Sequence, residues 1–242
     1  MNSLAIITGH SQGLGKALAG LFLEKEDYEV LGISRKKSGL SHSKLKEVSL
    51  DLSDMSSVHQ MLPDLFPKGD FDKIILVNNA GWIGPIIPLN KQNPKDIEAI
   101  NAINFLSPTL LCRQFLVQYG GEKTEKLICN ISSGLAYRAE SGLTGYCSSK
   151  SALAMLTEVL ALEDYKNCRF FSLAPGVVDT PMQDEIRAAS PSDFPKLDRF
   201  KDLKYSGSLV SAEETARKVL FLLDHPDRFE GVVQDVRKFD LG

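Results

Sequence analysis

A tyrosine and a lysine in the second half of the chain have the types and the spacing of an acid–base pair. Tyr146 and Lys150 lie four residues apart in a predicted helix over 145–164, so both side chains project from one face toward a common ligand. The ordinary pKa of a tyrosine is about 10, and a proton donor working near neutrality needs a neighbouring positive charge to lower it. Lys150 can supply that charge, so the pair predicts proton transfer to a bound ligand.

Two serines, Ser132 and Ser133, directly follow the predicted strand over 126–131. An open parallel sheet presents its ligand crevice at the carboxyl ends of its strands. A serine hydroxyl at this place could bond a carbonyl oxygen and stabilise the negative charge that develops on it.

A glycine-rich loop lies between a short apolar run, Leu4 to Ile7, and a helical pattern that follows it. Glycines in such a loop let the backbone approach a pyrophosphate, which then rests on the N–H groups of the helix N-terminus. The alternative is a plain tight turn, but the strand before the loop and the helix after it favour a phosphate site. The candidate residues of this loop are Gly9, Ser11, Gln12, Gly13, Leu14 and Gly15.

The second predicted strand, over 29–33, ends in a basic cluster. Ser34 occupies the position where a site for NAD usually carries a carboxylate for the ribose 2′-hydroxyl, and Arg35, Lys36 and Lys37 follow it. We therefore expect NADPH as the cofactor, with Arg35 pairing with the 2′-phosphate or stacking on the adenine. A solvated basic turn is the alternative.

Strand-like and helical segments alternate along the chain, which predicts one doubly wound α/β domain with a parallel sheet covered on both faces. Further strands are expected at 46–50, 73–77, 168–173 and 231–236, with helices at 94–119 and 211–223. The polar, Pro-containing stretch at about 181–210 interrupts this alternation and is expected to form a substrate lid beside the site.

The spacing TGxxxGxG, with Asp51-Leu52, Asn78-Asn79-Ala80-Gly81 and Pro175-Gly176 further along, resembles the short-chain dehydrogenase/reductase family. The resemblance implies a Rossmann fold of about seven strands, hydride transfer from NADPH to a carbonyl, and a homodimer through the helices over 94–119 and 145–164. It implies that the cofactor contacts Asp51, Leu52, Asn79, Ala80, Gly81, Tyr146, Lys150, Pro175, Gly176, Val178 and Thr180.

The same resemblance selects among the candidate catalytic residues. Ser133 lies thirteen residues before Tyr146, which is the family's serine-to-tyrosine spacing, so Ser133 is preferred to Ser132. Asn104 matches the family's catalytic asparagine, and Asn101 is the alternative. In this scheme Tyr146 donates the proton and Lys150 holds the ribose, while Asn104 holds a water that relays protons.

Within the family, the chain is similar to the sepiapterin reductase and bacterial benzil reductase subgroup, notably over Ala174 to Gln183 and Leu197 to Phe200. This implies reduction of one carbonyl of a 1,2-dicarbonyl compound or of a pterin side chain. Trp82 and Met182 could wall an apolar substrate, although Trp82 could instead pack in the core. Asp235 aligns with a substrate anchor or, alternatively, ends a strand. A hydroxysteroid or 3-oxoacyl reductase, or a silent NADP-binding regulatory protein, are the other interpretations.

Composition limits the partners. The chain has 242 residues, 28 Lys and Arg against 31 Asp and Glu, and a formal charge of −3, which argues against a nucleic-acid-binding surface. The four histidines are scattered and the four cysteines have no metal-ligand spacing, so no metal site is expected. The apolar runs are shorter than the roughly 20 residues that span a bilayer, and the start of the chain does not resemble a signal peptide. We expect a cytoplasmic protein with reduced cysteines.

Overall fold

The computed structural model describes residues 2–121 and 123–240, and its centre is a parallel sheet of seven strands. The strand order is β3-β2-β1-β4-β5-β6-β7, and every neighbouring pair is parallel. This confirms the predicted doubly wound α/β domain. The strands are β1 (Ser3–Thr8), β2 (Tyr28–Ser34), β3 (Leu45–Ser49), β4 (Lys73–Asn78), β5 (Glu125–Ile131), β6 (Cys168–Ala174) and β7 (Val233–Asp235).

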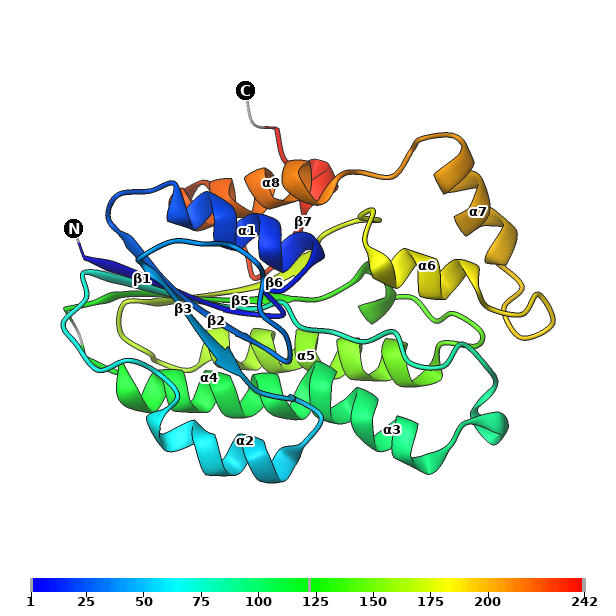
Figure 1. The fold of residues 1–242 in the computed structure, drawn as a ribbon, viewed down its shortest axis with the longest axis horizontal. Coiled ribbons are helices and arrows are strands. Elements are labelled where there is room, and N and C mark those ends of the chain that lie inside the picture. The colour runs from blue at the N-terminus through cyan, green and yellow to red at the C-terminus, as the bar shows by residue number, and fades with distance from the viewer. Residues whose placement is uncertain (1, 122, 241–242) are drawn as a thin grey trace.

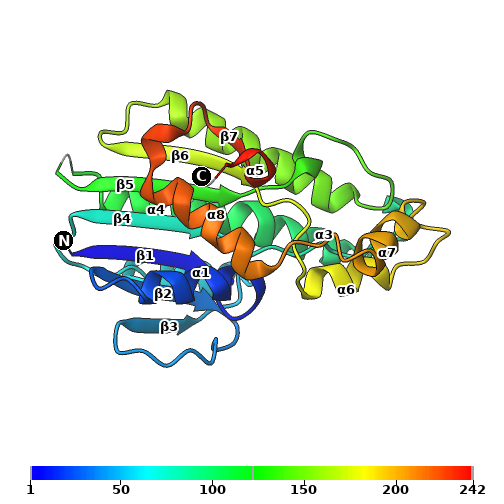
Figure 2. The same ribbon diagram turned by 90° about the horizontal axis from the view of Figure 1, so that it is seen from above.

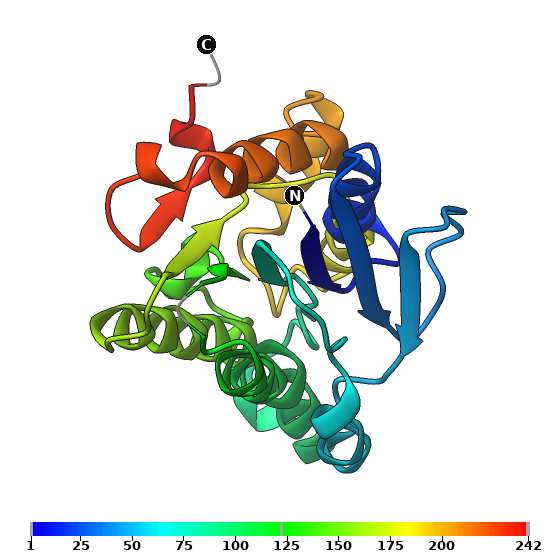
Figure 3. The same ribbon diagram turned by 90° about the vertical axis from the view of Figure 1, so that its left-hand side faces the viewer.

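Helices cover both faces of the sheet (Figures 1 and 3). One face carries α1 (Gly13–Leu23) and α8 (Ala212–Asp224), and the other carries α2 (Met55–Met61), α4 (Ser107–Gln118) and α5 (Thr144–Leu162). The central strands are buried on both sides and consist of nearly continuous apolar residues, as parallel strands covered twice require. Each face of the sheet has its own apolar core.

The arrowheads of the strands all point to one end of the molecule, where two further helices lie beyond the strand tips (Figure 2). These are α6 (Pro181–Arg187) and α7 (Leu197–Tyr205), both within the stretch expected to form a lid. The carboxyl edge of the sheet, where ligands bind in folds of this kind, therefore faces this pair of helices.

The helix expected over 94–119 is divided. It consists of α3 (Pro94–Asn101), a π-helical turn at Ala102–Leu106, and α4. A π-helical turn shifts the side chains that follow it around the helix axis, and such turns occur frequently at functional sites. Asn104 lies in the middle of this turn and is fully buried.

The described residues contain no helix that is long and apolar enough to cross a membrane. Over the same residues, no group of His, Cys, Asp and Glu side chains is arranged to hold a metal ion.

Candidate active site

The site forms where the strand order reverses, between the ends of β1 and β4. Thr8, the last residue of β1, fixes this crevice: its hydroxyl accepts hydrogen bonds from the backbone N–H groups of Asn79 (3.0 Å) and Ala80 (2.9 Å). The Asn79 amide group in turn donates to the carbonyl of Thr8 at 3.0 Å. Sequence reasoning did not assign a role to Thr8, although it precedes the glycine loop, and the structure shows that it joins the two candidate cofactor segments.

Gly9 and Gly15 of the loop lie too close to their neighbours to carry a Cβ, and Gly13 leaves little room for one. A Cβ on Gly9, where φ is +68°, would lie 2.9 Å from the Cα of Ala80, and one on Gly15 would lie 2.4 Å from Asn79 Nδ2. A Cβ on Gly13 would meet the methyl group of Thr180 at 3.0 Å. The loop is thus a bare backbone cradle held against Asn79, Ala80 and Thr180.

This cradle fits a pyrophosphate. It leads into the N-terminus of α1, where Gln12 precedes the first helical residue and, in the described part of the chain, no side chain caps the helix. The first turn of α1 carries no acidic residue. Its free N–H groups and the positive end of its dipole suit an anion. Gly9, Gly13 and Gly15, with the backbone of Ser11 to Leu14, are the residues that would hold the phosphates.

The predicted adenosine end lies beside this cradle, after β2. The Ser34 hydroxyl donates to the carbonyl of Lys36 at 2.6 Å, which closes a tight turn and leaves the side chains of Arg35 and Lys36 exposed. Asp51 follows β3 and accepts hydrogen bonds from the backbone N–H (2.9 Å) and the hydroxyl (2.7 Å) of Ser53, and Leu52 is buried. The turn after β2 therefore presents cations without a carboxylate at position 34.

Tyr146 and Lys150 lie side by side on α5, buried against the end of β5. The ammonium of Lys150 donates to the carbonyl of Ile131 at 2.7 Å and lies 5.9 Å from the centre of the Tyr146 ring. Burial lowers the pKa of Lys150 to about 8. The predicted shared face of one helix is therefore what the structure shows.

The expected lowering of the Tyr146 pKa by Lys150 is not what the structure shows for the chain by itself. Burial raises the pKa of Tyr146, and the nearby Ser133 side chain offsets this in part. The physical reason is that the ring is 7% exposed, while the Lys150 ammonium is directed at Ile131. Tyr146 is thus a protonated phenol at neutral pH.

The two serines after β5 have different surroundings. The Ser133 side chain lies near the Tyr146 phenol and lowers its pKa, and its Oγ accepts the backbone N–H of Leu135 at 3.1 Å. Ser132 is buried, and its hydroxyl has no hydrogen-bond partner within the described residues. The geometry brings Ser133, and not Ser132, together with Tyr146.

Asn104 joins α5 to the loop after β4. Its Oδ1 accepts the backbone N–H of Trp82 at 2.8 Å, and its Nδ2 donates to the Trp82 carbonyl at 2.9 Å and to the Ser149 hydroxyl at 3.0 Å. A Cβ on Gly81 would lie 3.4 Å from Lys150 Nζ and 3.5 Å from Asn104 Oδ1, which shows how closely these three residues meet.

Asn101 lies outside this group, because its amide donates to the carbonyl of Ile97 in its own helix at 2.8 Å. Asn101, at the end of α3, thus bonds within its own helix, whereas Asn104, within the π-helical turn, bonds residues of the site.

A third apolar cluster lies beyond the strand tips and closes one side of the site. Trp82 and Met182 are partly buried and pack against it, and Tyr146 is one of its buried members. Phe194, between α6 and α7, is fully buried in the same cluster. Sequence reasoning missed Phe194 because it is an isolated apolar residue in a polar stretch.

Asp235 ends β7 and is already paired. Its carboxylate accepts the backbone N–H of Arg237 at 3.0 Å and the Arg237 Nε–H at 2.9 Å, and this hydrogen bonding holds its pKa below the usual range. The Arg237 side chain lies over Gly176, its Cγ 3.5 Å from where a Cβ would be. The interpretation of Asp235 as a turn residue thus has a direct structural basis. Gly176, on the loop after β6, thus lies beside this pair, while Val178 further along the loop pairs with Val210.

Comparison with known proteins places the chain among relatives of its own length. It is 35% identical over 98% of this chain and 99% of the relative to a benzil reductase ((S)-benzoin forming) of Bacillus subtilis. It is 31% identical to the sepiapterin reductase of Meriones unguiculatus, over 91% of each chain.

Solved structures agree with this placement. A short-chain dehydrogenase/reductase from Saccharomyces cerevisiae superposes with a TM-score of 0.83 at 26% identity, over 98% of this chain and 97% of that one. A 4-hydroxyisoleucine dehydrogenase complexed with NADH gives a TM-score of 0.80 at 25% identity, over 97% and 96%. The fold thus binds a nicotinamide cofactor. The family model "short chain dehydrogenase" matches residues 3–191, and the chain accordingly belongs to the short-chain dehydrogenase family of oxidoreductases.

Proposed function

We propose that this protein is an NADPH-dependent carbonyl reductase in which Tyr146 donates the proton, Ser133 orients the carbonyl oxygen and Lys150 holds the ribose. The observation that carries the proposal is the placement of Lys150 beside the buried ring of Tyr146 at the carboxyl edge of the sheet, with the Ser133 side chain near enough to the phenol to lower its pKa in part. When bound, the reduced nicotinamide supplies the hydride.

The side chains fit this division of labour. The raised pKa of Tyr146 keeps its phenol protonated at neutral pH, so the proton to be donated is in place before the alkoxide develops. Ser133 offers a second hydroxyl to the same oxygen and stabilises the charge that develops there. Asn104 positions the backbone at Trp82 beside Lys150, and a water held there would complete the proton relay.

The proposed substrate is a 1,2-dicarbonyl compound such as benzil, with one of its two carbonyls reduced. The relatives named benzil reductase support this choice, and so do the apolar walls that Trp82 and Met182 would offer to a flat or aromatic substrate. The pairing of Asp235 with Arg237 argues against a free carboxylate for a pterin, so we place a dicarbonyl before a pterin side chain.

The test is the oxidation of NADPH in the presence of benzil, other vicinal diketones and sepiapterin. Tyr146→Phe should lower kcat by about 10²- to 10⁴-fold, the usual contribution of a general acid. Tyr165→Phe, between α5 and the start of β6 at the opposite edge of the sheet, is the matched control and should be unchanged. Binding of NADPH without turnover on any carbonyl would favour a regulatory protein instead. Turnover confined to steroid or 3-oxoacyl substrates would favour a hydroxysteroid or 3-oxoacyl reductase.

The preference for NADPH is proposed from the turn after β2, where Arg35, Lys36 and Lys37 are exposed. Arg35→Ala should weaken NADPH binding by about tenfold while leaving NADH binding nearly unchanged, because one charge-assisted contact with a phosphate is worth about 1.5 kcal/mol or more. Lys68→Ala removes an exposed cation elsewhere and is the control. Equal dissociation constants for the two cofactors in the unchanged protein would contradict the preference.

We further propose that residues 181–210 act as a substrate lid. Three ion pairs hold this segment to the body of the protein: Lys91 with Asp193, Lys196 with Glu140, and Lys204 with Asp179. The buried Phe194 adds an apolar contact. These contacts support a lid that packs on the apolar cluster containing Tyr146.

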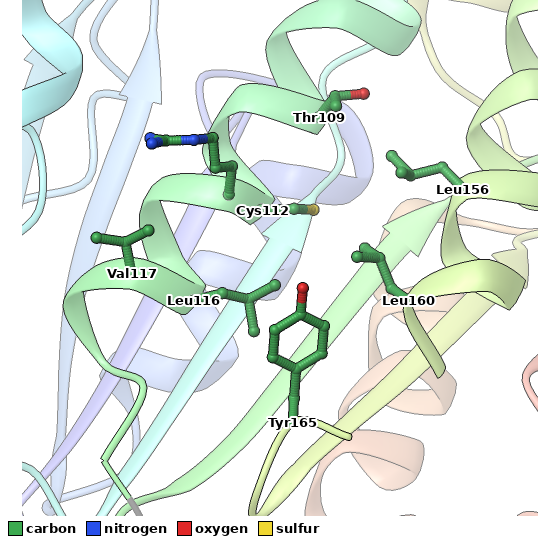
Figure 4. Close-up of a pocket in the computed structure, with 8 residues that line it drawn as sticks. Thr109, Cys112, Leu116, Val117, Leu156, Leu160 and Tyr165 are labelled. Carbon is green, nitrogen blue, oxygen red and sulfur yellow. The ribbon is translucent and has the colours of Figure 1, made fainter. Parts of the chain in front are cut away.

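A homodimer through α4 and α5 is supported by the apolar outer face of these helices. Val117, Met155 and Leu162 are 65%, 61% and 87% exposed there. Between the helices lies a groove of about 230 Å³, lined mainly by apolar side chains including Leu116, Leu156 and Leu160 (Figure 4). A dimer would cover this surface.

Light scattering tests the assembly: Leu162→Asp should convert a dimer into a monomer. A monomeric unchanged protein would contradict the proposal.

The cysteines within the described residues are unpaired, which supports a reducing, cytoplasmic location.

A further inference from the structure

A polar cluster at the glycine loop joins three segments that are distant in the sequence. His10 comes from the glycine loop, Ser38 from the segment after the basic turn, and Glu47 from β3. His10 and Ser38 are buried, at 0% and 4% exposure, and the Glu47 side chain is 16% exposed. None of the three has a part in the proton transfer described above.

One carboxylate oxygen of Glu47 holds the cluster together. Glu47 Oε1 lies 2.8 Å from His10 Nε2 and accepts the Ser38 backbone N–H at 2.7 Å and the Ser38 hydroxyl at 2.8 Å. Burial alone would raise the pKa of Glu47, but these hydrogen bonds lower it to about 2, so the carboxylate is ionised at any working pH. An ionised carboxylate accepts hydrogen bonds without donating, so His10 Nε2 carries the proton.

Strands β2 and β3 leave a space that the imidazole ring of His10 fills. Gly32 of β2 is paired in register with Glu47 of β3. A Cβ on Gly32 would lie 2.3 to 2.5 Å from atoms of the His10 ring, so the ring occupies the space that a side chain at position 32 would fill. The glycine in the middle of β2 therefore allows a bulky residue of the loop to reach the neighbouring strand.

Hydrogen bonds also fix the backbone of the basic turn, Arg35 to Lys37, at both of its ends. Ser34 donates to the Lys36 carbonyl at 2.6 Å, and Ser49 of β3 donates to the Arg35 carbonyl at 3.2 Å. At the far end, the two donors of Ser38 attach the turn to Glu47, and through Glu47 to the glycine loop. The cationic side chains are exposed, but the backbone that carries them is held at several points.

We propose that His10, Glu47 and Ser38 are positioning residues that hold the Arg35–Lys37 turn beside the glycine loop and thereby determine the preference for a 2′-phosphorylated adenine dinucleotide. This inference rests on the proposed use of NADPH. The extra phosphate is the group that the turn's cations would contact, whereas a dinucleotide without it depends mainly on the glycine loop. Loosening the turn adds an ordering cost to binding of the phosphorylated cofactor, so its affinity falls selectively.

The test compares the dissociation constants of NADPH and NADH, measured by fluorescence titration, in Glu47→Ala and in the unchanged protein. Glu47→Ala should weaken NADPH binding by about tenfold and NADH binding by less than about twofold, with kcat at saturating NADPH nearly unchanged. Glu47→Gln keeps an acceptor oxygen and should recover most of the NADPH affinity. Glu29→Ala removes an exposed carboxylate from neighbouring β2 and is the matched control.

A double-mutant cycle links the cluster to the cations it positions. In the Arg35→Ala background, Glu47→Ala should have a much smaller effect on NADPH than it has alone, because the contact that it positions is already absent. If Glu47→Ala lowers the melting temperature too far for titration, Ser38→Ala removes one hydroxyl donor and should produce a milder NADPH-selective loss of about threefold.

The outcomes separate the two proposals. Equal affinities for NADPH and NADH in the unchanged protein would overturn both. A preference that Arg35→Ala abolishes and that Glu47→Ala and Ser38→Ala leave intact would overturn the positioning role alone, as would a Glu47→Ala loss that is equal for the two cofactors.

Discussion

The buried ammonium of Lys150 should give this protein a stability that rises with pH through the alkaline range. Its pKa falls from 10.5 to about 8 on burial, a difference worth about 3 kcal/mol. Below pH 8 the ammonium is charged in both the folded and the unfolded chain, and the folded state bears the full cost of burying it. Between pH 8 and 10.5 the folded chain loses this proton while the unfolded chain keeps it, so the unfolded state binds more protons and stability increases.

Lys150→Met isolates this effect, because it removes the titrating group while retaining a long apolar side chain. The free energy of unfolding of the unchanged protein, relative to that of the variant, should increase by about 2 kcal/mol between pH 7 and pH 9.5. Urea denaturation at the two pH values measures it, and contributions from all other groups cancel in the comparison. Lys68→Met, at an exposed lysine, should show no such change. A difference between Lys150→Met and the unchanged protein that stays constant within about 0.5 kcal/mol would refute the reasoning.

Two further predictions concern the contacts that hold the site in place. Asn104→Ala should reduce kcat more than the affinity for NADPH and lower the free energy of unfolding by about 2 kcal/mol, since it leaves the N–H and carbonyl of Trp82 without these partners and removes one of the two hydrogen bonds of the Ser149 hydroxyl. Kinetics and urea denaturation check this, and an unaltered kcat would contradict it. Gly9→Ala should either abolish cofactor binding or lower the free energy of unfolding by about 1–3 kcal/mol, because its Cβ would approach Ala80 at a positive φ. A calorimetric titration with NADPH and a thermal melt check this. Normal binding with an unchanged melting temperature would contradict it.

The architecture could be predicted because its signals are local. Seven short apolar runs alternate with helical patterns, and each lies within a few residues of an observed strand. The pairing of Tyr146 with Lys150 follows from helical spacing, and the glycine loop follows from its place between a strand and a helix. Such inferences need no knowledge of how distant segments meet.

What escaped prediction depends on tertiary contacts. The π-helical turn around Asn104 has no residue signature that distinguishes it from an ordinary helix, so a continuous helix was expected. The contact of His10 with Glu47 joins positions 37 residues apart and depends on the register of β2 and β3. The available signal was Gly32, since a glycine inside an apolar strand often marks a close approach by another group. The rise in the Tyr146 pKa reflects burial, which helical spacing does not reveal.

The burial of Phe194 has a consequence for how quickly a substrate can enter. This side chain is fully buried, so any opening of the proposed lid must expose it to water. Exposing a buried phenylalanine costs about 1.5–3 kcal/mol, which corresponds to an open population of about one molecule in ten to one in 150. The rate of substrate binding would then be lower than the rate of diffusional encounter by that same factor. Phe194→Ala would increase the rate of binding and lower the affinity for the carbonyl substrate.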